Sequence, residues 1–91
     1  MSTIRILVAD DHGIVRKGLR FLLDRQPGME VVGEAREGRE AVRLSEGLAP
    51  DVAILDVAMP LLNGLEATRR ILKADPGARV LILSAHGDDE Y

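Results

Sequence analysis

The sequence predicts an α/β fold in which a doubly wound parallel sheet carries helices on both faces. Three observations support this prediction. Short apolar runs alternate regularly with amphipathic stretches, the connections between them are short, and acidic residues follow two of the apolar runs. Strands that alternate with helices in this way pair in parallel through right-handed crossovers. The 91 residues amount to one small domain at most.

The first two predicted elements are a strand and a helix. Residues 3–9 form a nearly continuous apolar run, which is typical of a strand covered on both faces. The helix that follows stops at Pro27 and Gly28. Its inward stripe is predicted to be apolar and to comprise Ile14, Val15, Gly18, Leu19, Leu22 and Leu23. The opposite, polar face carries Arg16, Lys17, Arg20 and Asp24.

The middle of the chain predicts a second strand, a second helix and a third strand. The second strand covers residues 30–35 and the second helix covers residues 38–48. Pro50 marks the boundary before a strand over residues 51–57. The apolar positions of this helix are Ala41, Val42, Leu44 and Leu48.

A third helix and a fourth strand complete the alternation. Asn63, followed three residues later by Glu66, is typical of a helix N-terminus, and residues 75–77 end that helix. Residues 79–84 are predicted to be the fourth strand, and the acids at 88–90 indicate that a further helix begins. The predicted inward positions of the third helix are Leu65, Thr68, Ile71 and Leu72.

Composition excludes several classes of function. The chain contains no cysteine, so disulfides and thiolate metal sites are excluded and a reducing cytoplasm is expected. No apolar run approaches the roughly 20 residues that span a bilayer, and we expect no membrane contact. The net charge is −3, and the basic residues are scattered among fifteen acids. Because nucleic-acid binding requires a basic stripe, these residues are not expected to bind DNA.

The acidic residues at strand ends predict a metal site. Asp10 and Asp11 follow the apolar residues 6–9, and Asp56 follows the apolar residues 52–55. Parallel strands bring their carboxyl ends to one edge of a sheet, where ligands of open α/β sheets bind. Three carboxylates gathered there repel one another, and a hard divalent cation with oxygen ligands relieves the repulsion. The sequence therefore predicts a Mg²⁺-dependent phosphoryl site.

The motifs together resemble a bacterial response-regulator receiver domain. These motifs are Asp10-Asp11 after the first strand, residues 55–60 after the third, Asn63-Gly64 beyond it, and Ser84-Ala85 after the fourth. The resemblance implies a flavodoxin-like sheet. Residues 9–19, 33–35 and 63–68 are most similar to the NarL/FixJ (LuxR-type) branch, whose members usually carry a C-terminal helix-turn-helix. The resemblance thus implies control of transcription, with DNA contacted only by an output domain outside these residues.

The resemblance also implies roles for particular residues. Asp56 would be the phosphoacceptor, taking a phosphoryl group from the phosphohistidine of a sensor histidine kinase. Asp11 would be a direct Mg²⁺ ligand, Asp10 an indirect one through water, and the backbone carbonyl of Ala58 a third ligand. Ser84 would hydrogen-bond a phosphoryl oxygen and transmit the change of state. Such a module is not an enzyme, since it catalyses only its own phosphorylation and dephosphorylation.

Five residues within or beside these motifs have further interpretations. Pro60 and Gly64 are interpreted as turn geometry, because proline fixes φ and glycine permits φ > 0. His12 is expected to be solvated at the start of the first helix, since imidazole adds little to a hard-cation oxygen site. By the resemblance, the side chain at Ala58 and His86 stand where the family tunes dephosphorylation; for His86, an exposed loop residue without such a role is the alternative.

The chain also departs from the family pattern. Complete receivers have a fifth strand, which carries a lysine and an aromatic switch residue, and a fifth helix. Lys17 and Lys73 lie in helices and cannot replace that lysine. Residues 1–91 are therefore interpreted as a C-terminally incomplete receiver with strand order 2-1-3-4. Residues 80–83 would form an open edge that favours self-association, as a dimer or by edge-strand pairing.

Two alternative functions follow from these departures. One is a truncated receiver that acts as an interaction module independent of phosphate. The other is a Mg²⁺-dependent phosphohydrolase that forms an aspartyl phosphate. Enzymes of that kind usually place a second acid two residues after the nucleophile, where Ala58 stands in this chain.

Overall fold

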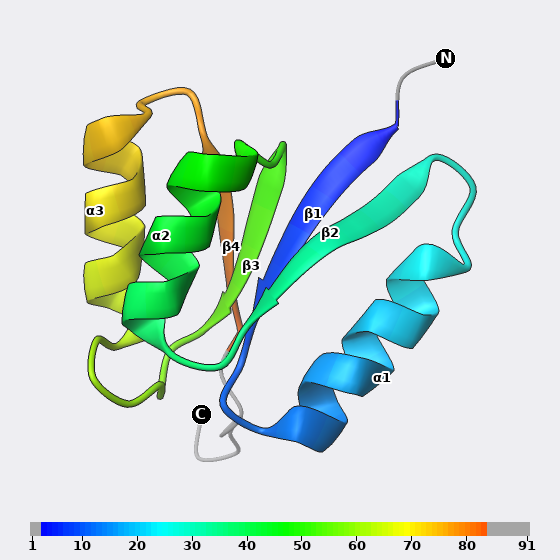
Figure 1. Cartoon of the computed structure of the whole chain (residues 1–91), viewed down its shortest axis with the longest axis horizontal. Helices are drawn as coiled ribbons and strands as arrows, with labels where there is room; N and C mark the ends of the chain where they lie inside the picture. Colours follow the sequence, from blue (N-terminus) through cyan, green and yellow to red (C-terminus); the bar gives the residue numbers. More distant parts are fainter. Residues whose placement is uncertain (1–2, 84–91) are drawn as a thin grey trace, which may run out of the picture.

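The computed structural model of the chain describes residues 3–83 and contains one parallel sheet with helices on both faces (Figure 1). The strand order is β2-β1-β3-β4, so the predicted fold class and strand order are confirmed. Helix α1 covers one face of the sheet, and α2 and α3 cover the other. The elements in chain order are β1 (Ile4–Ala9), α1 (Gly13–Asp24), β2 (Met29–Ala35), α2 (Gly38–Leu48), β3 (Val52–Asp56), α3 (Gly64–Ala74) and β4 (Arg79–Leu83).

The predicted bounds of the strands differ from the observed ones by no more than one residue at each described end. Helix α2 has the predicted bounds, and α3 begins after Asn63 as expected. The side chain of Asn63 accepts a hydrogen bond of 2.9 Å from the backbone N–H of Glu66, which confirms the N-cap. The Glu66 carboxylate pairs with Arg69 and Arg70 on its own helix. Position 84 of the predicted fourth strand, and the helix predicted from residues 88–90, lie outside the described residues.

The register of the sheet sets the acidic strand ends level. Ala9 of β1 pairs with Leu55 of β3 on one side and with Ala35 of β2 on the other. The next residues along the chain are Asp10, which follows β1, and Asp56, which ends β3, so they reach the same edge side by side. This edge lies at the lower end of the sheet in Figure 1, where α1 begins.

Two apolar cores fill the space between the sheet and its helices. Along β1, Leu7 and Ala9 face α2 and α3, whereas Ile6 and Val8 face α1, as the alternation of a strand requires. All four are buried, which confirms the prediction of a strand covered on both faces. Burying a side chain of leucine size contributes about 1.5–3 kcal/mol. The strand that precedes Asp10 is therefore firmly anchored between the two layers of helices.

The predicted inward stripe of α1 is partly wrong. Ile14 is 89% exposed, and Val15 and Leu22 are exposed as well, while Arg16 on the predicted polar face is buried. The helix lies over β1 and β2, so only a narrow stripe at positions 16, 19 and 23 faces the sheet. A guanidinium occupies the first of these positions because it finds hydrogen-bond acceptors there.

The stripe of α3 is also narrower than predicted. Leu65 is 58% exposed and Leu72 is exposed, contrary to the prediction, whereas Ile71 is buried as expected. The buried positions are Gly64, Ala67 and Ile71, which share one side of the helix. Leu65 and Leu72 lie outside this buried side of the helix and are therefore exposed.

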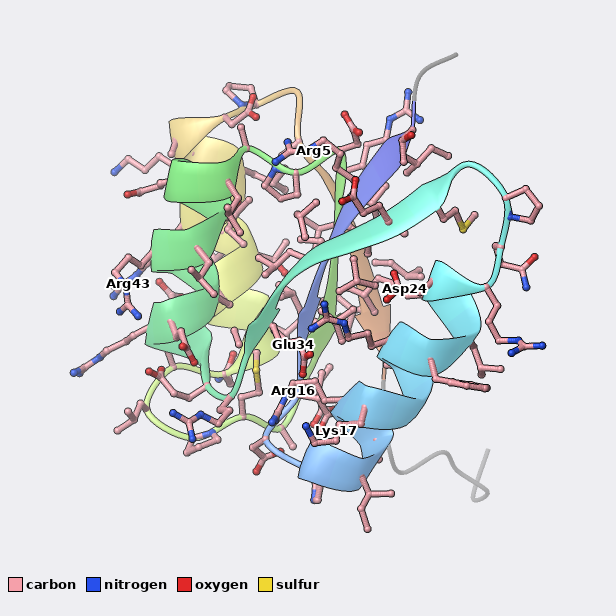
Figure 2. The ribbon with its side chains drawn as sticks, turned by 45° about the vertical axis from the view of Figure 1, so that its right-hand side comes forward. Arg5, Arg16, Lys17, Asp24, Glu34 and Arg43 are labelled. Carbon is pink, nitrogen blue, oxygen red and sulfur yellow. The ribbon has the colours of Figure 1, made fainter. Side chains whose placement is uncertain are left out.

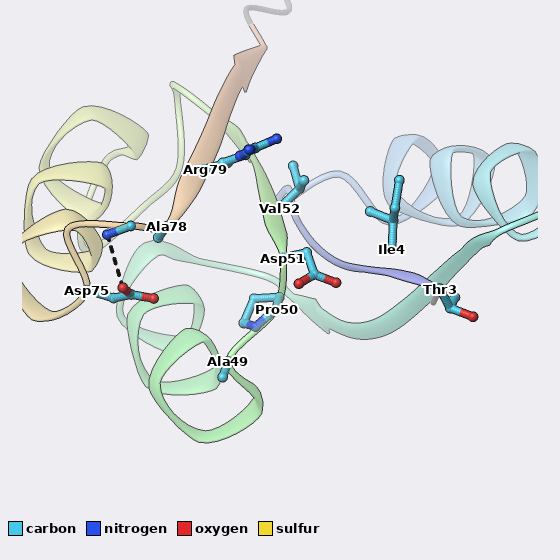
Figure 3. Close-up of a pocket in the computed structure, with 10 residues that line it drawn as sticks. Thr3, Ile4, Ala49, Pro50, Asp51, Val52, Asp75, Ala78 and Arg79 are labelled. Carbon is cyan, nitrogen blue, oxygen red and sulfur yellow. Dashed lines mark hydrogen bonds between the residues drawn. The ribbon is translucent and has the colours of Figure 1, made fainter. Parts of the chain in front are cut away.

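The end of the sheet where β1, β3 and β4 begin is opposite to the end that carries Asp10 and Asp56. A cavity lies there, and Figure 3 shows residues that line it. It has a volume of about 570 Å³, and its lining includes Pro50, Asp51 and Arg79. Arg5 borders it: its backbone N–H donates to an Asp51 carboxylate oxygen over 2.8 Å, and its guanidinium donates to the Ala49 carbonyl. These polar groups satisfy one another within the turns that begin the strands. Across residues 3–83, none of the helices has the length and apolar character needed to cross a membrane.

Candidate phosphoacceptor and metal site

The structure brings the three predicted acids together. One side-chain ligand atom from each of Asp10, Asp11, His12 and Asp56 can be chosen so that all four lie within 4.8 Å of one another. Asp10 and Asp11 follow β1, and Asp56 is the last residue of β3. The acids gather because β1 and β3 are parallel neighbours with level ends. The sequence predicts this proximity, because parallel strands bring their carboxyl ends to one edge of a sheet.

The acids differ in their access to solvent. Asp56 is 3% exposed and Asp10 is similarly buried, whereas Asp11 is exposed. The backbone N–H of Asp10 donates to the carbonyl of Ala35, which ties this residue to β2 over 3.0 Å. The site is thus an acidic cluster with two buried members, Asp10 and Asp56, and one exposed member, Asp11.

Asp56 contains an unpartnered buried oxygen. Its Oδ2 atom has no hydrogen-bond partner among the described residues and no contact with solvent. A buried carboxylate oxygen without a partner costs free energy, which a cation or a hydrogen-bond donor would recover. The atoms near it that could coordinate a metal include carboxylate oxygens of Asp10 and Asp11, and carboxylate oxygens are ligands that Mg²⁺ prefers. The residues present therefore fit a hard divalent cation.

His12 contacts both acids that precede it. Its Nδ1 atom lies 3.0 Å from Asp10 Oδ1 and 3.1 Å from Asp11 Oδ1. The hydrogen bond with Asp10, and then the charge of Asp11, raise the pKa of His12 above its usual value. The residue caps α1 and its side chain is 59% exposed, as expected for a solvated residue at a helix start. The sequence places His12 beside the acids, but its contacts with Asp10 and Asp11 were not predicted.

The turn between β3 and α3 corrects one prediction. Gly64 does not adopt the positive φ that was expected of it; Leu61 does, with a φ of 68°. Gly64 is needed for a different reason, since a Cβ atom at this position would lie 2.3 Å from the carbonyl oxygen of Asp56. Its backbone N–H donates to the Val57 carbonyl over 2.9 Å. Pro60 is exposed in the same turn, and its carbonyl accepts from the N–H of Leu62.

A second glycine holds this turn from the other side. A Cβ atom at Gly38, the first residue of α2, would lie 1.7 Å from the carbonyl oxygen of Leu62. The start of α2 therefore packs directly on the turn that follows Asp56. This contact was not predicted, because a glycine at a helix start has several possible causes.

The roles predicted for Ala58, Ser84 and His86 depend on the family resemblance alone. Ala58 is exposed, which leaves its side chain free to vary. Ser84 and His86 lie outside the described residues. Their roles stay predictions.

Comparisons with known proteins agree with this geometry. Residues 6–91 match the response regulator receiver domain. The transcriptional regulatory protein DegU of Brevibacillus brevis is 42% identical over 90 residues, which cover 99% of this chain and 38% of that protein. This chain spans about two fifths of the length of DegU and of other transcriptional regulatory proteins that it matches.

Solved structures give the same result. A LuxR-family response regulator from Aurantimonas sp. SI85-9A1 is 46% identical with a TM-score of 0.89, over 94% of this chain and 61% of that one. A chain of the CheX–CheY–BeF₃–Mg²⁺ complex from Borrelia burgdorferi is 27% identical with a TM-score of 0.86, over 98% of this chain and 67% of that one. The fold, the acidic strand ends and these matches together show that the chain belongs to the receiver-domain family of response regulators, alongside transcriptional regulators of the LuxR family.

Proposed function

We propose that this chain is a phosphorylatable receiver in which Asp56 accepts a phosphoryl group from a sensor histidine kinase, with Mg²⁺ bound beside it. The observation that carries the proposal is the buried, unpartnered Oδ2 of Asp56 within a cluster of carboxylates. Further support comes from the relative that was solved with BeF₃ and Mg²⁺.

The reaction is a phosphoryl transfer between two nucleophiles. A carboxylate oxygen of Asp56 attacks the phosphorus of a phosphohistidine, so that a P–O bond forms as the P–N bond breaks. The electron pair of the broken bond returns to the imidazole nitrogen of the kinase. A carboxylate is a competent nucleophile, and among the described residues no hydrogen-bond donor competes for the lone pairs of Asp56 Oδ2. When bound, Mg²⁺ would neutralise charge on the phosphoryl oxygens.

The acids would divide the work of holding the ion. Asp10 already accepts the backbone N–H of His12 at Oδ1 over 2.8 Å, which suits an indirect contact through water. Asp11 is exposed and suits a direct contact. The Asp56 oxygen that does not attack the phosphorus would also contact the ion directly. The backbone carbonyl of Ala58 would be the third direct ligand. Ser84 would contact the phosphoryl group, and Ala58 and His86 would modulate its lifetime.

The biological output would be control of transcription. Support comes from DegU, a transcriptional regulatory protein that is longer than this chain. DNA would be contacted by a separate output domain, and phosphorylation would act by changing self-association of the receiver. The partners we propose are therefore a histidine kinase and a second receiver.

Phosphorylation by a small-molecule phosphodonor tests the proposal. The protein would be treated with acetyl phosphate with and without MgCl₂, and the label would be trapped with borohydride and located by peptide mass spectrometry. We expect Mg²⁺-dependent labelling at Asp56 and none in the Asp56→Asn variant. Labelling that does not need Mg²⁺, or that falls on Asp10 or Asp11, would overturn the assignment. An unlabelled protein would favour a phosphate-independent interaction module.

A further inference from the structure

Arg16 is a buried cation that the proposed chemistry does not use. It lies on α1, is 9% exposed, and stands beside Glu34 of β2 (Figure 2). Its Nε atom donates to a Glu34 carboxylate oxygen over 2.9 Å. One of its terminal nitrogens donates to the backbone carbonyl of Asp10 over 2.8 Å, in a buried hydrogen bond. A single guanidinium thus joins the end of β2 to the backbone of the acidic site.

The carbonyl that Arg16 holds belongs to the peptide bond between Asp10 and Asp11. This peptide is planar, so fixing its oxygen restricts the orientation of the whole unit. The N–H of Asp10 is held by Ala35, and its Oδ1 atom by the N–H of His12. The direction in which the chain leaves Asp10 towards Asp11 is therefore set by Arg16.

Glu34 keeps the guanidinium in place. Its second carboxylate oxygen accepts from Arg20, one turn further along α1, over 2.5 Å. Arg20 and then Arg16 hold the pKa of Glu34 below its usual value, so the carboxylate stays charged. The guanidinium has a planar fork of donors that addresses two acceptors at fixed angles, which the ammonium of lysine lacks. The arrangement suits an arginine that orients a peptide.

We propose that Arg16 is a positioning residue of the acidic site: anchored by Glu34, it orients the Asp10–Asp11 peptide and thereby sets the affinity for Mg²⁺. The inference rests on the proposed function, since it concerns the same cation. Replacing a group that orients a metal ligand, without contacting the metal itself, typically lowers metal affinity by about 10–100-fold. Arg20 provides a matched control, because it shares Glu34 and its hydrogen bonds within the described residues go to Glu34 and Asp24, not to Asp10.

The test compares the parent protein with Arg16→Lys, Arg16→Met and Arg20→Gln. MgCl₂ binding is measured by calorimetry, and backbone amide shifts are recorded by NMR without metal. We expect Arg16→Lys and Arg16→Met to weaken Mg²⁺ binding by about 10-fold or more, and to shift the Asp11 amide before metal is added. Arg20→Gln should leave the Mg²⁺ affinity and the Asp11 amide shift close to the parent values. If Arg16→Met does not fold, Arg16→Lys still gives the result.

The outcomes separate this inference from the proposed function. A parent protein that does not bind Mg²⁺ overturns the proposed function, and the affinity claim with it. A parent that binds Mg²⁺, with an Arg16→Lys variant that binds equally well and has an unmoved Asp11 amide, overturns only the positioning role. Equal losses in Arg16→Lys and Arg20→Gln would also overturn it, because packing of α1 on β2 would then be the cause.

Discussion

Gly64, the first residue of α3, packs directly against the backbone of Asp56, the last residue of β3. A Cβ atom at Gly64 would lie 2.3 Å from the Asp56 carbonyl oxygen and 2.9 Å from the Cα atom of Val57. Both atoms belong to the backbone and cannot move aside cheaply. The position of the proposed phosphoacceptor therefore depends on the absence of a side chain at the start of the next helix.

Replacing Gly64 by alanine should destabilise the fold. Forcing a methyl group into a packed site typically costs about 1–3 kcal/mol, and here it must push α3 away from Asp56. Urea unfolding followed by circular dichroism would measure the loss. Gly18→Ala is the control, because a Cβ atom there meets no atom within 4 Å on an exposed part of α1. This control should be stabilised by about 1 kcal/mol; a Gly64→Ala variant as stable as the parent would refute the packing argument.

Leu61→Gly should stabilise the turn after the phosphoacceptor. Leu61 has a φ of 68° and is 67% exposed, so it carries backbone strain and contributes little burial. The left-handed conformation costs a non-glycine residue about 1–2 kcal/mol, which exceeds the entropic cost of glycine of about 0.5–1 kcal/mol. Thermal unfolding would show a small gain for Leu61→Gly. Leu61→Val should lose stability, since β-branched residues tolerate positive φ poorly; the opposite order of the two variants would count against the strain.

The contribution of Glu34 should disappear in acid. Two arginines on α1 lower its folded pKa below the ordinary value of 4.5. A carboxylate with a depressed folded pKa adds stability above its unfolded pKa, and this stability is lost as the pH falls through the folded value. The parent should therefore be more stable than Glu34→Gln at pH 7, and the two should converge below about pH 4.5. Urea midpoints across this range would test it; a gap that widened in acid would contradict the sign.

Asp56→Asn should stabilise the protein when no divalent cation is added. It removes a buried charge whose Oδ2 atom lacks a partner, and an unsatisfied buried group costs about 1–3 kcal/mol. Added MgCl₂ should then stabilise the parent, by about 2.7 kcal/mol at 100 times the dissociation constant. Asp56→Asn and Asp11→Ala should gain much less. NaCl at matched ionic strength is the control, and equal stabilisation by NaCl would show that screening of charge, without a bound ion, is the cause.

Some of these features could be predicted from the sequence, and others depend on tertiary contacts. The meeting of Asp10, Asp11 and Asp56 was predictable, because parallel pairing fixes where strand ends go. The burial of Arg16 was not, because its partner Glu34 lies on a different element and periodicity places a charged residue on the polar face. The exposure of Ile14 depends on which strands α1 covers. The sequence indicates that the turn requires a glycine at position 64. It does not show whether the reason is a positive φ or, as observed, the close packing of the glycine on the Asp56 backbone.

The central position of β1 and β3 has a consequence for folding. These strands are neighbours in space, yet β2 and two helices separate them along the chain. The cluster of Asp10, Asp11 and Asp56 therefore cannot form from any local segment, and it forms only when β1 and β3 pair. This non-local pairing costs loop entropy and slows folding. Local fraying that releases an outer helix leaves β1 and β3 paired. The level ends of β1 and β3, which place Asp10 beside Asp56, are lost only when this strand pairing opens, so hydrogen exchange of the β3 backbone amides should report the opening that separates these two acids.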